Sequence, residues 1–136
     1  NVGSGSLIDR CTARSNGRDG IAAFSSSRIL DCEASDNDDH GIDVGSDCTV
    51  TGNSCDGKGS AITNGAGIRC SGPDNRVDQN SCTDNDRGFW LEGGGNILVR
   101  NTASGNGTNY VTVGGNDVGA LQVTPVGAGA WDNFSF

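Results

Sequence analysis

The chain has very few of the side chains from which an ordinary globular core is built. Methionine is absent, proline occurs twice, aromatic residues make up 5% of the 136 positions, and 33% are hydrophobic. A core made from such a sequence must be narrow and filled with small side chains. No apolar run approaches the roughly 18 residues needed to cross a bilayer, so we expect no membrane insertion. The length predicts a single domain spanning residues 1–136.

Basic residues are also scarce. Nine Lys and Arg face 17 Asp and Glu, which gives a net charge of -8. This charge repels nucleic acids and anionic membrane surfaces, so we expect no nucleic-acid partner. The absence of an initial methionine indicates a processed fragment, with any export signal in the upstream part.

Glycine is abundant, with 23 residues. The pattern of residue types along the chain repeats with a period of about 21 residues. An aliphatic residue recurs at Ile8, Ile29, Val50, Val77 and Leu98. Three residues later come Cys11, Cys32, Asn53, Asn80 and Asn101, and two residues after these come Ala13, Ala34, Cys55, Cys82 and Ala103. The third repeat is longer than the others, through an insertion near Asp56 to Ala66.

A repeat of this length holds two or three short alternating segments and cannot bury a face by itself. Stacked copies can, because each turn lays its strands about 4.8 Å above those of the previous turn, with equivalent residues aligned. We therefore expect an all-β solenoid of about five turns and three short parallel sheets over residues 6–116. Leucine-rich repeats have a similar period but require a leucine pattern that is absent here.

The asparagine columns also have a structural interpretation. We expect Asn53, Asn80 and Asn101 to form a ladder at the turn corners, with Cys11 and Cys32 at its start. Asparagine tolerates left-handed backbone, and its side-chain amide can bond the asparagine stacked above. A second set either forms another ladder or simply occupies turns; it contains Asn16, Asn37, Asn85 and Asn106.

The cysteines are expected to stack in pairs, Cys11 over Cys32 and Cys55 over Cys82. The stacking distance lies within the disulfide range, but side chains in parallel register point the same way, which strains a bridge. Buried thiols acting as small hydrophobic groups are therefore favoured over disulfides. No C-x-x-C pair is present, so we expect no zinc site.

The segments GNSC, QNSCTDN, RNTASGN and GIDV resemble repeats of the right-handed parallel β-helix superfamily, which includes pectate-lyase-like and periplasmic copper-protein-like repeats. The resemblance implies an extracellular or periplasmic location. Residues 117–136 resemble the closing segment of bacterial β-helix proteins, in which aromatic residues such as Trp131, Phe134 and Phe136 cover the open end of the core. Solenoid ends need caps because they expose unpaired sheet edges, and self-association through these ends is a further possibility.

The densest group of carboxylates is DNDDHGIDVGSD, from Asp36 to Asp47, which holds the single histidine. Its spacing matches a calcium loop, but the helices that flank such a loop are replaced by expected strands. A solvated turn is therefore favoured. The alternative is a surface calcium ion held across neighbouring turns by Asp36, Asp38 and Asp84. We expect no other cofactor.

A candidate binding face comes from the strands that follow each Gly-Ile step. Alternation turns Asp43, Arg69 and Trp90 outward into one column that begins at Ala22, with Glu92 beside it. An exposed indole among charged groups can stack on a sugar ring while its neighbours bond the hydroxyls, so a polysaccharide is the expected ligand. The alternative is ion pairing between strands, with Trp90 covering its neighbours.

The function we expect is a non-catalytic β-helix module of an exported bacterial or phage protein, either a carbohydrate binder or a rigid spacer. The resemblance also implies an alternative, a fragment of a polysaccharide lyase or uronan C5-epimerase, which abstracts a proton beside a uronate carboxylate. His40, Arg69 and Arg87 are then the candidates for base and neutralising group. The stretch Asp38 to Gly41 keeps the Asp and His of the epimerase motif Asp-Pro-His-Glu and lacks its Pro and Glu.

Overall fold

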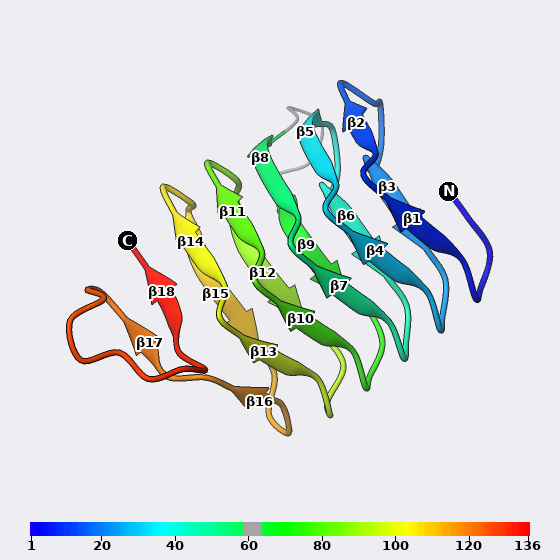
Figure 1. Ribbon diagram of the computed structural model, residues 1–136. Helices are drawn as coiled ribbons and strands as arrows, with labels where there is room; N and C mark the ends of the chain where they lie inside the picture. Colours follow the sequence, from blue (N-terminus) through cyan, green and yellow to red (C-terminus); the bar gives the residue numbers. More distant parts are fainter. Residues whose placement is uncertain (59–63) are drawn as a thin grey trace.

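A computed structural model describes residues 1–58 and 64–136. The chain coils about a single axis, and each full turn contributes one strand to each of three sheets (Figure 1). Successive turns lie side by side from the N-terminal end to the C-terminal end, and the strand pairs recorded in the described residues are parallel. These features confirm the predicted all-β solenoid of about five turns with three short sheets.

Within residues 1–58 and 64–136, the three sheets contain 18 strands. In stacking order the first sheet contains β1 (Leu7–Asp9), β4 (Arg28–Leu30), β7 (Thr49–Thr51), β10 (Arg76–Asp78), β13 (Ile97–Val99) and β16 (Asp117–Val118). The second sheet contains β2 (Thr12–Arg14), β5 (Glu33–Asn37), β8 (Ser54–Lys58), β11 (Ser81–Thr83), β14 (Thr102–Ser104), β18 (Asn133–Ser135) and β17 (Leu121–Gln122). The third sheet contains β3 (Ile21–Ala23), β6 (Ile42–Val44), β9 (Ala66–Cys70), β12 (Arg87–Leu91) and β15 (Thr108–Thr112).

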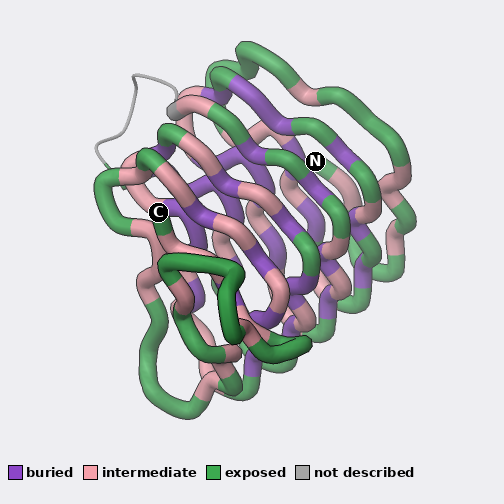
Figure 2. The backbone as a smooth tube through the Cα atoms, turned by 60° about the vertical axis from the view of Figure 1, so that its left-hand side comes forward, coloured by how far each residue is buried: buried purple, intermediate pink, exposed green. Residues whose placement is uncertain are grey.

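The core follows the repeat read from the sequence. In the first sheet the predicted aliphatic column is in register, and four of its members are fully buried: Ile29, Val50, Val77 and Leu98. The second sheet contributes the predicted column of small side chains: Ala13, Ala34, Cys55, Cys82 and Ala103. Buried positions therefore line the inside of the coil along its length (Figure 2).

Aromatic side chains enter the core in its last turns. Phe89 is fully buried, and the ring of Tyr110 stacks on it with centroids 5.2 Å apart. The Tyr110 hydroxyl lies 3.0 Å from the carbonyl oxygen of Asn101 and 2.7 Å from that of Phe134. Tyr110 thus covers the C-terminal end of the third-sheet column and ties it to the tail.

Each corner of the coil is built from two consecutive residues with different tasks. The first residue has a left-handed backbone, and at the corner between the first and second sheets these residues are Arg10, Asp31, Gly52, Gln79 and Arg100. The second residue is the predicted ladder residue, such as Asn53 or Asn80. The expectation that asparagine itself takes the left-handed bend was therefore wrong, because the residue before it does so and the asparagine supplies hydrogen bonds.

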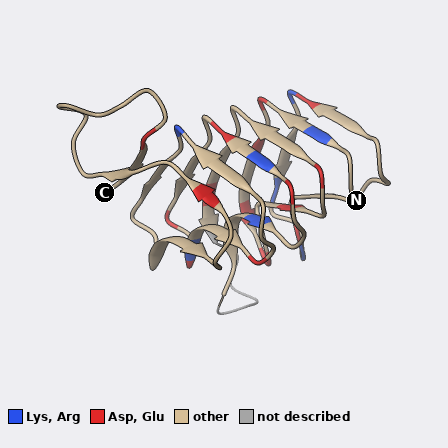
Figure 3. Cartoon of the chain, turned by 90° about the horizontal axis from the view of Figure 1, so that it is seen from below, with Lys and Arg blue, Asp and Glu red and all other residues tan. Residues whose placement is uncertain are grey.

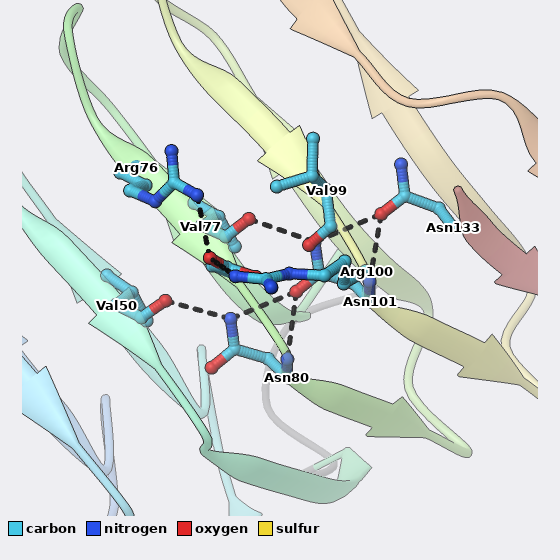
Figure 4. Close-up of polar contacts among 9 residues, drawn as sticks. Val50, Arg76, Val77, Asn80, Val99, Arg100, Asn101 and Asn133 are labelled. Atoms are coloured by element: carbon cyan, nitrogen blue, oxygen red, sulfur yellow. Dashed lines mark hydrogen bonds and ion pairs between the residues drawn. The ribbon is translucent and has the colours of Figure 1, made fainter. Parts of the chain in front are cut away.

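The predicted asparagine ladder is present (Figure 4). The side-chain oxygen of Asn80 accepts from the backbone N–H and the side-chain amide of Asn53, both at 2.9 Å, and that of Asn101 accepts likewise from Asn80. The ladder begins with Cys11 and Cys32, as predicted: the N–H of Cys11 donates to Cys32 Sγ at 3.4 Å, and the N–H of Cys32 donates to Asn53 Oδ1 at 2.9 Å. It ends at Asn133 in the tail, which the repeat pattern did not reveal.

The other two corners carry ladders as well. The second set forms two separate pairs, Asn16 with Asn37 and Asn85 with Asn106, because Lys58 of the third turn follows Asn37 in this column. A third ladder escaped the sequence interpretation because serine and cysteine occupy its first rungs. Its members are Ser6, Ser27, Cys48, Asn75, Asn96 and Asn116.

The C-terminal tail closes the coil differently from the expectation. It adds β16 to the first sheet and β18 to the second, so these two sheets continue beyond the last full turn, whereas β15 is the terminal strand of the third sheet. Phe134 lies within β18, but Trp131 and Phe136 are 57% and 58% exposed. The prediction that these two side chains cover the core was wrong, because Tyr110 occupies that place.

All six cysteines are free thiols, in agreement with the preference for thiols over disulfides. Five are buried, whereas Cys11 is exposed rather than buried as expected. The insertion predicted near Asp56 to Ala66 contains residues 59–63, which lie outside the described residues. Within residues 1–58 and 64–136, no helix is long and apolar enough to cross a membrane.

Candidate functional site

The outer face of the third sheet carries the column predicted from strand alternation. Ala22 lies beside Asp43, Asp43 beside Arg69, and Arg69 beside Trp90 on successive strands. Charged residues of both signs are spread over the outside of the coil (Figure 3). In this column the side chains of Asp43, Arg69 and Trp90 are each partly buried.

Arg69 links the two acidic residues of the column face. Its Nη1 lies 3.5 Å from Asp43 Oδ2, while Nε and Nη2 donate to Glu92 Oε2 at 3.2 and 2.7 Å. Burial opposes the charged form of Arg69, but the hydrogen bonds that it donates to Glu92 and the negative charge of Asp43 outweigh burial and raise the pKa of the guanidinium. Arg69 therefore stays cationic and fixes both carboxylates.

The Trp90 ring is in contact with charged and aromatic side chains of neighbouring strands. The guanidinium carbon of Arg87 lies 4.0 Å from the ring centroid and that of Arg69 lies 5.2 Å away, and the ring of His40 meets it edge-on at 6.0 Å. Such cation–π contacts are worth about 0.5–1 kcal/mol each at partly exposed sites. The half-buried indole thus covers charged side chains, which is the alternative to sugar stacking that the sequence left open.

Asp43 and Arg87 each keep a buried polar atom without a hydrogen-bond partner among the described residues, Asp43 Oδ1 and Arg87 Nη1. Arg87 uses Nη2 to donate to Asn64 Oδ1 at 3.1 Å. Burial raises the pKa of Asp43 to about 6, although the nearby Arg69 opposes this shift. A buried group left unpaired is costly, so such atoms in a native fold call for an explanation, such as a water or ligand.

A hollow of about 230 Å³ lies beside Asp43, where the small side chain of Ala22 leaves room. Phe24, which is 60% exposed, forms part of its wall. The other side chains that line it include Arg18, Asp19 and Ser71. The sequence interpretation missed Phe24, although an aromatic residue in register with Gly45 of the next turn was a readable signal.

A family model described as right handed beta helix region matches residues 1–124. The chain belongs to the right-handed β-helix family. The match runs from the first strand through β17 and so includes the whole column face. Comparisons with curated proteins and with solved structures found no match.

The candidate catalytic residues lie close together in this β-helix, but His40 is not free to act as a base. It is 6% exposed, and its Nδ1 accepts a hydrogen bond from the N–H of Ala66 at 3.0 Å. Burial lowers the pKa of His40, while the charge of Asp19 opposes the shift, so the ring is neutral at pH 7. Its one proton then sits on Nε2, which leaves no free lone pair to accept a proton.

The three candidate calcium ligands do not converge. Asp36 and Asp84 occupy one column, but Gly57 of the intervening turn lies between them. Asp36 instead pairs with Arg14 at 3.4 Å. Among the described residues, no group of three or more His, Cys, Asp or Glu side chains is placed to hold a metal ion, and Asp38 joins no such group.

Proposed function

We propose that this β-helix is a non-catalytic carbohydrate-binding module of an exported protein and that it holds a sugar in the hollow beside Asp43. The observation that carries the proposal is the buried, unpartnered Oδ1 of Asp43 at the edge of a hollow with an exposed aromatic wall, Phe24. Sugar sites combine an apolar ring surface with a few fixed polar groups. A small rotation of the Asp43 carboxyl group would present Oδ1 to a hydroxyl group.

The protonation of Asp43 suits this role. With a pKa of about 6, Asp43 accepts hydrogen bonds when ionised and also donates one when protonated. A sugar hydroxyl group can also both donate and accept a hydrogen bond, so it can pair with either form of Asp43. Arg69, held by Glu92, keeps the carboxyl group in place on the side away from the hollow.

Charged groups of both signs line the hollow, which favours a neutral sugar. Arg18 lies in the wall with Asp19 and Asp43, and Asp43 is also paired with Arg69 behind it. A strongly anionic polymer gains little from such a surface, because attraction and repulsion cancel over a short distance. The alternative, a lyase or epimerase fragment, is favoured by one observation, since a carboxyl pKa near 6 suits proton transfer.

The test is affinity electrophoresis of the purified chain in gels that contain xylan, hydroxyethyl cellulose, galactomannan, polygalacturonate or alginate. We expect retardation by at least one of the neutral polymers, weakened about tenfold in Phe24→Ala because one ring contact is lost. Phe136→Ala is the matched control, since Phe136 is equally exposed, at 58%, at the opposite end of the coil. Asp43→Asn should also weaken retardation.

The same polymers are followed by ultraviolet absorbance for unsaturated products and by NMR for inverted uronate residues. Either product would overturn the non-catalytic role in favour of the lyase or epimerase. If a folded chain were retarded by none of the polymers, the rigid spacer would replace the binding module. Retardation that is the same in Phe24→Ala and Asp43→Asn as in the wild type would place the binding site elsewhere.

A further inference from the structure

A second hollow, of about 290 Å³, lies on the outer face of the first sheet near the C-terminal end. It is lined by Arg76, Ile97, Val99, Asp117, Val118, Gly119 and Trp131. The apolar part of its wall comes from β13, β16 and the indole, and the polar part from one arginine and one aspartate. It lies on a different sheet from the hollow beside Asp43.

Trp131 is exposed but firmly placed. Its neighbour Asp132 accepts through Oδ2 from the N–H of Gly129 at 2.7 Å and from Gln122 Nε2 at 2.8 Å, which fixes the tail loop. On the other side, Asn133 is the last rung of the central ladder. The backbone at Trp131 also lies so close to Gly119 that a Cβ there would collide with the Trp131 carbonyl oxygen. Trp131 forms a contiguous apolar wall with Ile97 and Val99, and an apolar patch in a hollow is typical of a binding surface.

Two arginines, Arg76 and Arg100, lie near the indole, and Arg100 contacts its ring. Arg100 lies 5.0 Å from the Trp131 ring centroid and binds Asp78 through Nε at 2.7 Å. Arg76 binds the same carboxylate through Nη2 at 2.9 Å and remains 40% exposed. Burial opposes ionisation of Asp78, but the hydrogen bonds from the two arginines outweigh it and lower the pKa. The Arg76 guanidinium is therefore oriented by a permanent negative charge.

We propose that this hollow binds a single pyranose ring of a neutral saccharide, with the indole of Trp131 against one face of the ring. Arg76 donates to the ring hydroxyls and Asp117 accepts from them. Two cations, Arg76 and Arg100, face two anions, Asp78 and Asp117, so the site favours a neutral ligand over a charged one. The volume lies at the small end of the range for ligand pockets, which limits the ligand to about one ring.

The test uses Trp131 as its own reporter. In the variant Trp90→Phe, Trp131 is the remaining indole, and its emission is titrated with xylotriose, cellotriose, maltotriose and triacetylchitotriose. We expect a saturable change with at least one of these probes. Arg76→Gln should weaken it about tenfold because a charged hydrogen-bond donor is lost. Val126→Ala, an 83% exposed tail residue outside the hollow, is the control and should leave the titration unchanged.

The wild type provides a second measurement that does not depend on Trp90→Phe. Titration calorimetry of the wild type with the responding trisaccharide should give a binding isotherm that includes one site. This site should disappear in Trp131→Ala and persist in Phe24→Ala. Absence of a response to all four probes would overturn this proposal, and so would a binding isotherm that Trp131→Ala leaves unchanged. Emission that changes on dilution without sugar would assign the surface to a second copy of the chain instead. A failed retardation test with Phe24→Ala concerns only the hollow beside Asp43, so the two proposals fail separately.

Discussion

The side-chain oxygen of Asn133 accepts hydrogen bonds from both the backbone N–H and the side-chain amide of Asn101, at 2.9 and 3.1 Å, although 32 residues separate the two in the chain. Within the coil, the same pair of bonds joins Asn53 to Asn80 and Asn80 to Asn101 at intervals of 27 and 21 residues. The tail is thus attached to the coil by the same hydrogen bonds that hold successive turns together.

Removal of a central rung should be far more costly than removal of a terminal one. Asn80→Ala removes the acceptor of the Asn53 backbone N–H and of one N–H of its side-chain amide, and it removes one donor to the Val50 carbonyl. Each unpaired buried group costs about 1–3 kcal/mol, so we expect a loss of roughly 3 kcal/mol or more in the free energy of unfolding. Urea unfolding followed by circular dichroism measures it.

The control is Asn116→Ala, which removes the same two acceptor bonds, made with Asn96 at 2.9 Å. Asn116 is only partly buried, so water can replace it and the loss should be about 1 kcal/mol. Equal losses in the two variants would show that burial of the ladder does not contribute to its strength.

Glycine at two of the corner positions, Gly52 and Gly115, avoids two separable costs. Gly52 has a φ of 71°, and a Cβ there would collide with Oδ1 of Asp31 on the preceding turn. Gly115 has a φ of 84° and open space around it, with Gly94 Cα as its nearest neighbour at 4.0 Å. We expect Gly115→Ala to cost about 1 kcal/mol from backbone strain alone, and Gly52→Ala to cost clearly more.

Asp31 also has a left-handed backbone, with a φ of 51°, so the reference for the double variant Asp31→Gly with Gly52→Ala is Asp31→Gly alone. Against that reference, Gly52→Ala should lose only the stability due to backbone strain, because the collision is gone. Thermal unfolding of the wild type, Gly115→Ala, Gly52→Ala, Asp31→Gly and the double variant separates the two costs. If Gly52→Ala cost as much against that reference as in the wild type, the contact with Asp31 would not explain the requirement for glycine at position 52.

The stability of the protein should depend on pH through Asp43. Burial raises the pKa of this carboxyl group from 3.8 to about 6, so between these values the folded chain holds a proton that the unfolded chain has lost. The contribution of Asp43 to stability is therefore complete below about pH 4 and declines as the pH rises through 6. With allowance for partial exposure, we expect a decline on the order of 2 kcal/mol.

Asp43→Asn should remove this decline between pH 4 and 6.5, as followed by urea midpoints at each pH. Asp78→Asn is the contrasting variant, because the pKa of Asp78 is lowered and its contribution is lost as the pH falls below about 4. An identical profile for wild type and Asp43→Asn would show that Asp43 titrates normally.

Thiol reactivity should single out one cysteine. Cys11 is exposed, whereas the other five are buried, and burial raises the pKa of the thiols of Cys32, Cys48, Cys70 and Cys82. Because the thiolate is the reactive form, brief treatment of the native protein with iodoacetamide should modify Cys11 and spare the rest until urea unfolds the chain. Peptide mass mapping identifies the modified positions, and a blocked Cys11 would point to a disulfide.

The sequence by itself determined the coil. A period of about 21 residues brings equivalent side chains into register, so the aliphatic column, the Ala and Cys column and the outward line from Ala22 to Trp90 were all predictable. The asparagines of the central ladder followed from the same period. Serine and cysteine rungs concealed the ladder that ends at Asn116, because the pattern alone does not show that their Oγ or Sγ atoms accept the same bond.

Only the tertiary structure decided the features that do not follow the period. The tail folds back so that Asn133 joins the ladder while Trp131 remains outside, and Tyr110 rather than Trp131 covers the core. The tertiary structure also brought Arg87 onto the Trp90 ring and left a hollow beside Ala22. These outcomes depend on side-chain directions and on contacts between residues at unrelated positions in the repeat, and the spacing of residue types does not contain this information.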